Sequence, residues 1–214
     1  MAIERELKLA LSEPDAARLA EVLGPPQAIL HQRNHYLDTA QGTLRRLGHG
    51  LRLREEDGRR RLTLKGPSHP AGAMTERLEL EVAVTPADAD LLLAGARSIG
   101  ELPLPVPDAL ARETGPQRLR VLGMIENERR VFRLRLGERP PGEPTEAEVE
   151  LDRTHYPDGS VTHELEVEWP HPTAPFPERA VRALLDRAGV PWRPQTKSKL
   201  ARFLETSGLS GATP

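Results

Sequence analysis

The stretch Ala2-Ile-Glu-Arg-Glu-Leu-Lys-Leu9 shows the pattern on which most of the chain is built. Its charged residues Glu4, Glu6 and Lys8 lie two positions apart, and mostly aliphatic residues lie between them. Successive side chains of a β-strand point to opposite faces. The stretch therefore predicts a strand with two carboxylates and an ammonium group on one face and aliphatic groups on the other. A single strand of this kind is typical of any solvated sheet, so its recurrence decides what it means.

Composition narrows the class of protein. The 214 residues suit one large domain or two small ones, and 30 Lys and Arg against 32 Asp and Glu give a net charge of −2. This balance indicates no general attraction to nucleic acid or membrane, and 3% aromatic residues leave few rings for stacking on bases. The absence of cysteine excludes disulfides and thiolate metal sites. No segment resembles a signal peptide or a membrane span, so we expect a cytoplasmic protein.

Residue spacing predicts a mainly β chain with amphipathic helices. Strands are expected at 2–12, 28–37, 51–54, 61–65, 75–85, 118–125, 129–136, 146–152 and 161–169, and helices at 15–23, 86–96, 178–188 and 196–205. A turn or short helix is expected around Leu44, loops at 66–72 and 137–144, and a proline-rich connection at 101–116. One domain is expected over 1–207, followed by a disordered tail at 208–214.

The alternation of charged and aliphatic residues returns on five further strands. Their charged or polar positions are Arg52 and Arg54; Arg61, Thr63 and Lys65; Arg77, Glu79 and Glu81; Glu146, Glu148, Glu150 and Asp152; Glu164, Glu166 and Glu168. The signs are also sorted along the chain. Residues 45–65 hold eight basic against three acidic side chains, whereas residues 143–168 hold nine acidic against one basic. Neighbouring carboxylates repel one another unless a cation or facing bases compensate them.

Two architectures satisfy this pattern. An open sheet would turn its charged face to water and cover its aliphatic face with helices. A closed barrel would turn the charges inward and carry the helices outside. The sorting of signs favours the barrel, because a lumen lined by bases and carboxylates can hold a polyanion together with its metal ions.

The charged motifs resemble those of the CYTH superfamily, the triphosphate tunnel metalloenzymes. They begin with Glu4-x-Glu6-x-Lys8 and continue in the family's order with His35–Thr39, Leu51–Arg54, Leu62–Gly66, Glu79-x-Glu81, Leu151-Asp152, Glu164-x-Glu166-x-Glu168 and Ser198-Lys199. The resemblance covers about residues 2–204 and is nearest to the single-domain bacterial branch. It implies an α+β, mainly β fold, in which an eight-stranded antiparallel closed barrel forms the tunnel and helices pack outside. It also implies hydrolysis or cyclisation of triphosphates with Mg²⁺ or Mn²⁺.

The residues suit this chemistry. A triphosphate carries about four negative charges, which several Arg and Lys side chains can hold by charge-assisted hydrogen bonds. Hard divalent cations prefer carboxylate oxygens. We expect metal binding by Glu4, Glu6, Glu164 and Glu166, and substrate binding by Lys8, Arg52, Arg54, Lys65, Arg129 and Lys199. Glu4, Glu6, Lys8 and Glu166 are the expected catalytic residues, and Glu79, Glu81, Asp152 and Glu168 the supporting ones.

Three of these assignments have alternatives. Arg129 is preferred to its neighbour Arg130 because it shares a face with Arg133 and Arg135. Glu168 is either a further metal ligand or a residue nearer the rim of the tunnel. The position of Lys199 resembles that of the family's C-terminal lysine that closes over the site, although a surface lysine fits the sequence nearly as well.

The predicted activity is hydrolysis of inorganic triphosphate, or of thiamine triphosphate or ATP, by metal-activated water. The alternatives are an adenylate cyclase that makes cyclic AMP from ATP, and a non-enzymatic module that binds nucleotides or polyphosphate. The expected partner is a small-molecule triphosphate, with neither nucleic acid nor membrane, and the expected state is a monomer or a homodimer.

Overall fold

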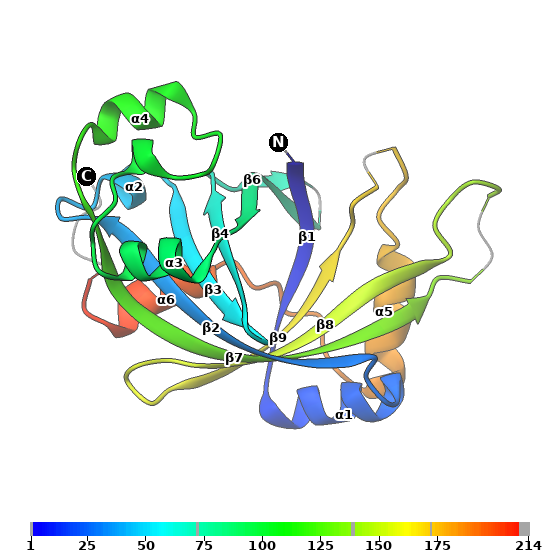
Figure 1. Ribbon diagram of the computed structural model, residues 1–214. Helices are drawn as coiled ribbons and strands as arrows, with labels where there is room; N and C mark the ends of the chain where they lie inside the picture. Colours follow the sequence, from blue (N-terminus) through cyan, green and yellow to red (C-terminus); the bar gives the residue numbers. More distant parts are fainter. Residues whose placement is uncertain (1, 72, 138–139, 172, 210–214) are drawn as a thin grey trace.

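The strands form an antiparallel sheet that closes into a barrel (Figure 1). The computed structural model describes residues 2–71, 73–137, 140–171 and 173–209. The strands are β1 (Ala2–Leu11), β2 (Ala28–Thr39), β3 (Gly50–Glu56), β4 (Arg59–Lys65), β5 (His69–Ala71), β6 (Met74–Ala83), β7 (Leu119–Arg135), β8 (Glu146–His155) and β9 (Val161–Glu168). They pair in the order β1-β9-β8-β7-β2-β3-β4-β6-β5, and β1 also pairs with β6. Eight strands therefore complete the ring, and the open sheet is excluded. The short strand β5 pairs with the beginning of β6.

Helices fill the connections between the strands. They are α1 (Glu13–Leu23), α2 (Thr43–Arg46), α3 (Pro86–Leu93), the 3₁₀ turn η1 (Ile99–Glu101), α4 (Asp108–Thr114), α5 (Glu178–Ala188) and α6 (Lys199–Thr206). The start of α1 follows from its sequence: the Ser12 hydroxyl accepts a hydrogen bond from the Asp15 amide, and the Asp15 carboxylate accepts one from the Ser12 amide. None of the helices in the described ranges is long and apolar enough to cross a membrane.

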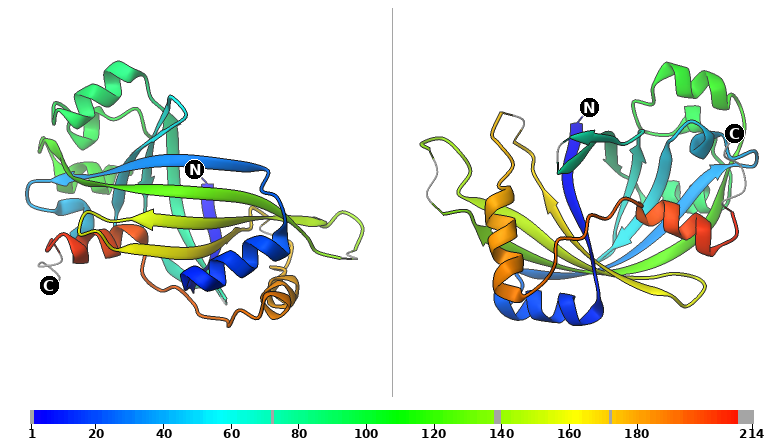
Figure 2. Two further views of the ribbon diagram at one scale, coloured as in Figure 1. Left: turned by 90° about the horizontal axis from the view of Figure 1, so that it is seen from below. Right: turned by 180° about the vertical axis from the view of Figure 1, so that it is seen from behind.

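The aliphatic residues of the strands face outward into two separate cores. On one side α1 and α5 lie next to each other (Figures 1 and 2) and cover β1, β7, β8 and β9, with Leu19 and Leu184 packed in the same cluster as Trp169. On the other side, α3, α4 and η1 cover β3, β4 and β6. Each fully buried leucine contributes about 1.5–3 kcal/mol through removal of apolar surface from water. This outer packing leaves the charged faces of the strands to line the interior, as the alternation predicts.

The region predicted as two strands at 118–125 and 129–136 is one strand, β7, of 17 residues. The polar run between the two segments resembles a turn in the sequence. Its middle residue, Asn127, is buried and instead takes part in cross-strand pairs: it donates to the Gln32 side chain at 3.0 Å and accepts from the Thr154 hydroxyl at 2.7 Å. These bonds let the strand continue through the polar segment.

Two other segments differ from the sequence-based expectation. The proline-rich connection contains η1 and α4, where the buried side chain of Leu110 joins the second core. The loop expected at 66–72 contains β5. Of the tail expected at 208–214, residues 210–214 lie outside the described residues. Just before them, the Leu209 amide donates a hydrogen bond to the Leu204 carbonyl oxygen at 2.8 Å.

The last helix, α6, lies against inward-facing side chains rather than on the outer wall of the barrel. Its Phe203 ring packs on Tyr36, with ring centroids 5.2 Å apart, in a small core that also contains Ile125. A Cβ atom at Gly123 would lie 2.6 Å from the Phe203 ring, so only glycine permits this close approach. The prediction of a closed barrel with helices packed around it is thus confirmed, and α6 differs from α1, α3, α4 and α5 in lying against inward-facing side chains.

Candidate active site

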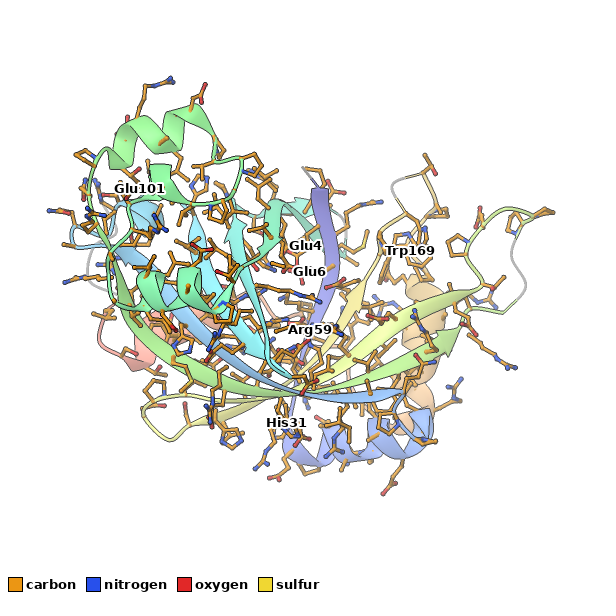
Figure 3. All side chains as sticks on the ribbon, viewed as in Figure 1. Glu4, Glu6, His31, Arg59, Glu101 and Trp169 are labelled. Carbon is orange, nitrogen blue, oxygen red and sulfur yellow. The ribbon has the colours of Figure 1, made fainter. Side chains whose placement is uncertain are left out.

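The inward faces of all eight barrel strands and the start of α6 line a cavity of about 1100 Å³. Figure 3 shows Glu4 and Glu6 pointing from β1 into the barrel. Arginine, lysine and glutamate side chains dominate the lining, and Tyr36 is the one Phe, Tyr or Trp among the described lining residues. The interior is therefore a charged compartment, suited to a small, highly charged ligand.

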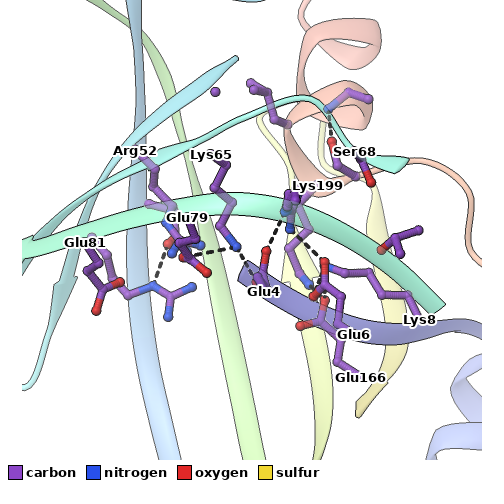
Figure 4. A pocket seen from close by; sticks show the side chains of 18 of the residues that line it. Glu4, Glu6, Lys8, Arg52, Lys65, Ser68, Glu79, Glu81, Glu166 and Lys199 are labelled. Carbon is purple, nitrogen blue, oxygen red and sulfur yellow. Dashed lines mark hydrogen bonds and ion pairs between the residues drawn. The ribbon is translucent and has the colours of Figure 1, made fainter. Parts of the chain in front are cut away.

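The two carboxylates of β1 are held by bases from three strands (Figure 4). Glu4 accepts from the Lys65 ammonium at 2.7 Å and also from the Arg77 guanidinium. Glu6 accepts from Arg77 at 2.7 Å and pairs with Lys8 at 3.1 Å. Burial tends to raise the pKa of Glu4, but the charges of Lys65 and Arg77 outweigh it and hold that pKa well below its usual range. Glu4 is thus ionised throughout the neutral range.

The carboxylate of Glu166 on β9 is a second meeting point of bases. It lies 2.9 Å from the ammonium of Lys8, 2.6 Å from that of Lys199 and 2.7 Å from the guanidinium of Arg129. Burial opposes ionisation here, yet these three cations hold the pKa of Glu166 well below its usual range. Glu166 therefore links β1, β7 and α6 through charge.

Arg129 and Lys199 are already saturated with carboxylates. Arg129 is 8% exposed, and its guanidinium binds Asp152 through two hydrogen bonds of 2.8 and 2.6 Å. It also pairs with Glu150 at 2.6 Å. The Lys199 ammonium pairs with Asp152 at 2.8 Å and with two glutamates of β9. Both residues point inward, as predicted. Carboxylates already pair with their charged groups, so they are less available to bind phosphate than bases without such partners.

Arg130, the alternative to Arg129, is exposed and pairs with Glu128 at 2.9 Å. The face of β7 that carries Arg129 and Arg133 is therefore the one that faces the interior of the barrel.

Arg52 and Arg54 differ from the other inward-facing bases, because neither has a carboxylate partner among the described residues. Arg54 donates to the Asn34 side chain at 2.9 Å, and Arg52 makes one long contact of 3.4 Å to the Thr63 hydroxyl. Burial and the nearby charges of Arg52 and Arg129 lower the pKa of Arg54 to about 9. Two half-buried guanidinium groups that form no direct ion pair with a described carboxylate are a site that favours an anion.

Some carboxylates at the cavity wall lack sufficient positive charge. Glu168 lies directly opposite Glu6 in the β1–β9 pairing, and in the part of the chain that the structure describes its carboxylate has no hydrogen bond or ion pair. Burial raises the pKa of Glu168, and burial together with Glu166 and Asp152 raises that of Glu150 to about 8 despite the nearby Arg129. A cation placed among these oxygens would relieve the repulsion.

The donor atoms of this wall fit a hard divalent cation. The set consists of carboxylate oxygens alone, the type that Mg²⁺ and Mn²⁺ bind. Opposite residues on one face of a sheet have Cβ atoms about 4.5–5.5 Å apart, so Glu6 and Glu168 are close enough to share an ion. Within residues 2–71, 73–137, 140–171 and 173–209, no three carboxylate or histidine side chains are already arranged around one metal-sized point.

Glu164, an expected metal ligand, lies beside Glu166 but further than Glu166 from Glu6, since the Lys199 ammonium pairs with Glu164 and Glu166 together. It pairs with Lys199 at 2.8 Å and with Arg202 at 2.7 Å, and it is opposite Ala10 in β1. Glu168 lies four residues further along β9, which places it about 13 Å away. Alternation predicts on which face of a strand a residue lies, but not its position along the tunnel. Glu164 and Glu168 therefore share the inward face of β9, and Glu168 is the one that lies opposite Glu6.

The supporting residues lie near the bases. Glu79 pairs with Lys65 at 3.4 Å, and burial raises its pKa. Glu81 accepts from the Thr63 hydroxyl at 3.0 Å and pairs with Arg61 at 3.4 Å. Asp152 holds Arg129 in place, as described above.

Sequence reasoning did not assign a role to Arg77 or Asn34. Arg77 bridges Glu4 and Glu6, and it shares the charged face of Glu79 and Glu81, which was a usable signal. Asn34 lies two residues from Tyr36 on the inward face of β2. The neighbouring inward positions of this strand are polar but uncharged, so the pattern of charged positions did not include them.

Comparison with known proteins agrees with this geometry. The sequence profile of the CYTH domain matches residues 2–204. No curated protein matches the sequence. Among solved structures, HpAC1 from Hippeastrum, a candidate adenylyl cyclase described as having a dominant triphosphatase activity, is similar with a TM-score of 0.75 and 25% identity, covering 94% of this chain and 95% of that one.

Two further structures support the fold. A candidate adenylate cyclase from Bacillus halodurans has a TM-score of 0.66 and 24% identity, with 95% of this chain and 99% of that chain covered. A protein from Pyrococcus horikoshii has a TM-score of 0.59 and 17% identity, with 94% and 98% covered. The closed barrel is thus a shared architecture.

Proposed function

Because the chain belongs to the CYTH family, we propose that it is a metal-dependent triphosphate hydrolase whose preferred substrate is inorganic triphosphate. One observation carries the proposal: Arg52 and Arg54 are half-buried in the tunnel, have no carboxylate partner among the described residues, and lie in the same cavity as a wall of glutamates. A ligand that satisfies both must bring several negative charges and accept a divalent cation. Triphosphate has these properties.

The bases of the tunnel would bind and orient the substrate. Arg52 and Arg54 offer guanidinium donors that no carboxylate of the described ranges occupies. Lys65 and Lys8 lie in the same cavity, and their flexible stems allow their ammonium groups to reach phosphate oxygens. Phosphoryl transfer depends mainly on positioning and on stabilisation of charge, so a fixed set of cations supplies much of the catalysis.

The glutamates would hold the metal and manage protons. Glu4, Glu6, Glu166 and Glu168 are the proposed ligands of Mg²⁺ or Mn²⁺. Such an ion, when bound, would neutralise phosphate charge and make bound water more acidic. Glu150, with a pKa raised to about 8 by burial and its carboxylate neighbours, exchanges its proton near neutral pH and is suited to accept or return one.

The cavity wall argues against a nucleotide as the preferred substrate. A cyclase must recognise adenine, yet the ring of Tyr36 is the one Phe, Tyr or Trp in the described lining, and it is already packed against Phe203. The cavity volume of about 1100 Å³ accommodates a nucleotide, so the chemistry of the wall and not its size makes the distinction.

A substrate panel tests the proposal. Purified protein is incubated with inorganic triphosphate, ATP or thiamine triphosphate, each with Mg²⁺ or Mn²⁺, and phosphate, pyrophosphate and cyclic AMP are measured. We expect phosphate release, fastest from inorganic triphosphate, and none with excess chelator. Cyclic AMP with pyrophosphate as the main products would establish the cyclase instead, and tight binding without turnover under every condition would establish a binding module.

A further inference from the structure

Every side-chain oxygen of Glu4 and Glu6 already contacts a base. On Glu4, Oε1 lies 2.7 Å from the Lys65 ammonium and Oε2 accepts from Arg77. On Glu6, Oε1 accepts from Arg77 at 2.7 Å and Oε2 lies 3.1 Å from the Lys8 ammonium. In this arrangement a divalent cation must compete with a base for each of these carboxylate oxygens and is repelled by its charge.

The three bases differ in how readily they can leave. Arg77 bridges two carboxylates through separate nitrogens of a planar group, which fixes its orientation. Lys65 and Lys8 each present an ammonium group at the end of a flexible four-carbon stem. Arg52, for which the described part of the chain provides no carboxylate partner, lies next to Lys65 in Figure 4. An anion held by Arg52 would therefore be within the reach of Lys65.

We propose that triphosphate completes its own metal site. On binding to Arg52 and Arg54, the triphosphate attracts the ammonium of Lys65 away from Glu4, and that of Lys8 away from Glu6, so that carboxylate oxygens become available to the divalent cation. Lys65 is thus a positioning residue with two opposite effects: it helps to bind the anion, and it blocks the metal ligands while the anion is absent. This inference rests on the proposed function, because it requires that triphosphate enters the tunnel.

Two consequences follow from thermodynamic linkage. The protein without triphosphate should bind a divalent cation weakly, although its tunnel is rich in carboxylates. Triphosphate should strengthen metal binding, and metal should strengthen triphosphate binding by the same factor. Couplings between sites typically lie between about 5-fold and 150-fold. Part of this coupling would come from direct contact between phosphate and metal, so a variant that isolates the effect of Lys65 is needed.

Lys65→Met provides that variant. Titration calorimetry measures the binding of Mn²⁺ alone to the full-length protein, and separately the binding of inorganic triphosphate in the presence of EDTA. We expect Lys65→Met to bind Mn²⁺ at least tenfold more tightly than the parent protein, because Glu4 has lost a competing cation. The same variant should bind triphosphate at least tenfold more weakly.

Two controls separate this effect from a general change of charge. Arg130→Met also removes one positive charge, but Arg130 is exposed and pairs with Glu128 at 2.9 Å, so both affinities should stay within about twofold. Lys65→Arg keeps the positive charge and should restore weak Mn²⁺ binding. A thermal melt of each variant confirms that it is folded.

The outcomes distinguish the two proposals. Equal Mn²⁺ affinity in the parent protein and Lys65→Met, with triphosphate binding intact in the parent, overturns the inference and leaves the hydrolase proposal in place. A parallel loss of both ligands in Lys65→Met also overturns it, because it assigns Lys65 a purely structural role. If triphosphate fails to bind the parent protein in either the presence or the absence of Mn²⁺, the proposed function itself is wrong.

Discussion

Replacement of Arg54 by methionine should make the ligand-free protein more stable while it damages the binding site. The pKa of this buried guanidinium falls from 12.5 to about 9, chiefly through burial and then through repulsion by Arg52 and Arg129. Because burial and the neighbouring cations lower this pKa, they disfavour the charged form, and the charged side chain opposes folding throughout the neutral range. At 1.36 kcal/mol per pKa unit the penalty amounts to about 5 kcal/mol.

The substitution also removes a favourable contact. Arg54 donates to the Asn34 oxygen at 2.9 Å, and a buried amide oxygen left unpaired costs about 1–3 kcal/mol. The net gain in the free energy of unfolding is therefore about 2–4 kcal/mol. For a chain of this length 1 kcal/mol shifts the melting temperature by about 2–4 °C, so Arg54→Met should melt at least about 4 °C above the parent protein.

Differential scanning calorimetry in EDTA, with and without inorganic triphosphate, measures both effects. In Arg54→Met, triphosphate should raise the melting temperature much less than in the parent protein. The kcat/KM of the variant should also fall, by an amount that corresponds to a loss of about 2–4 kcal/mol of transition-state stabilisation. Arg130→Met, which removes an exposed guanidinium paired with Glu128, should change neither quantity by more than about 0.5 kcal/mol. A lower melting temperature for ligand-free Arg54→Met, or an undiminished response to triphosphate, would refute the reasoning.

Three further expectations concern the glutamates and the ligand. Glu6→Gln keeps the shape of a proposed metal ligand but removes its charge, so turnover should fall by about a thousandfold or more with the fold intact; circular dichroism and a phosphate-release assay check this, and full activity would contradict it. Inorganic triphosphate alone should raise the melting temperature, by about 2.7 kcal/mol of stabilisation at a hundredfold excess over its Kd, whereas monophosphate spans too few bases to do so; equal shifts with both ligands, or with chloride at the same ionic strength, would argue against the site. In the native state the pKa of Glu150 is raised from 4.5 to about 8, so between these values the native state keeps a proton that the unfolded state has lost. The free energy of unfolding should therefore fall by up to about 1.4 kcal/mol per pH unit as the pH rises through this window. Urea unfolding from pH 5 to pH 8 should show a smaller decrease with pH for Glu150→Gln than for the parent protein, and equal decreases would contradict the assignment.

Alternation in the sequence predicted which face of each strand turns inward, because that property depends only on whether a position is odd or even. The structure places Glu4, Arg52 and Glu166 on the cavity wall in agreement with it. The two aliphatic cores outside the barrel follow from the same pattern. The closed ring itself was favoured by the sorting of charges, which an open sheet does not require.

The height of a residue along the tunnel was not predictable in the same way. Glu164 and Glu168 are equivalent in alternation, but the pairing of β9 with β1 places Glu168 opposite Glu6 and Glu164 opposite Ala10. Pairing is set by the whole sheet and not by one strand. For the same reason the sequence could not show that Lys199 meets Asp152, or that Arg129 would be enclosed by carboxylates.

Polar residues inside a barrel also obscure its strands. Asn127 was expected to belong to a turn, since asparagine is frequent there. In the barrel it is satisfied by Gln32 and Thr154 from the neighbouring strands. A local reading of the sequence has no access to partners that lie so far along the chain.

The closure of the ring by β1 has a consequence for the order in which the protein acquires its structure during synthesis. The neighbours of β1 are β6 and β9, and Glu6 lies opposite Glu168. At a translation rate of about 5–20 residues per second, β1 waits roughly 10–30 s for its second neighbour to be made. During that interval the edge of β1 that later pairs with β9 has no partner strand, and such exposed edges are prone to association. Charged side chains on an edge strand disfavour this association, so Glu4, Glu6 and Lys8 would protect the waiting strand before they serve the tunnel.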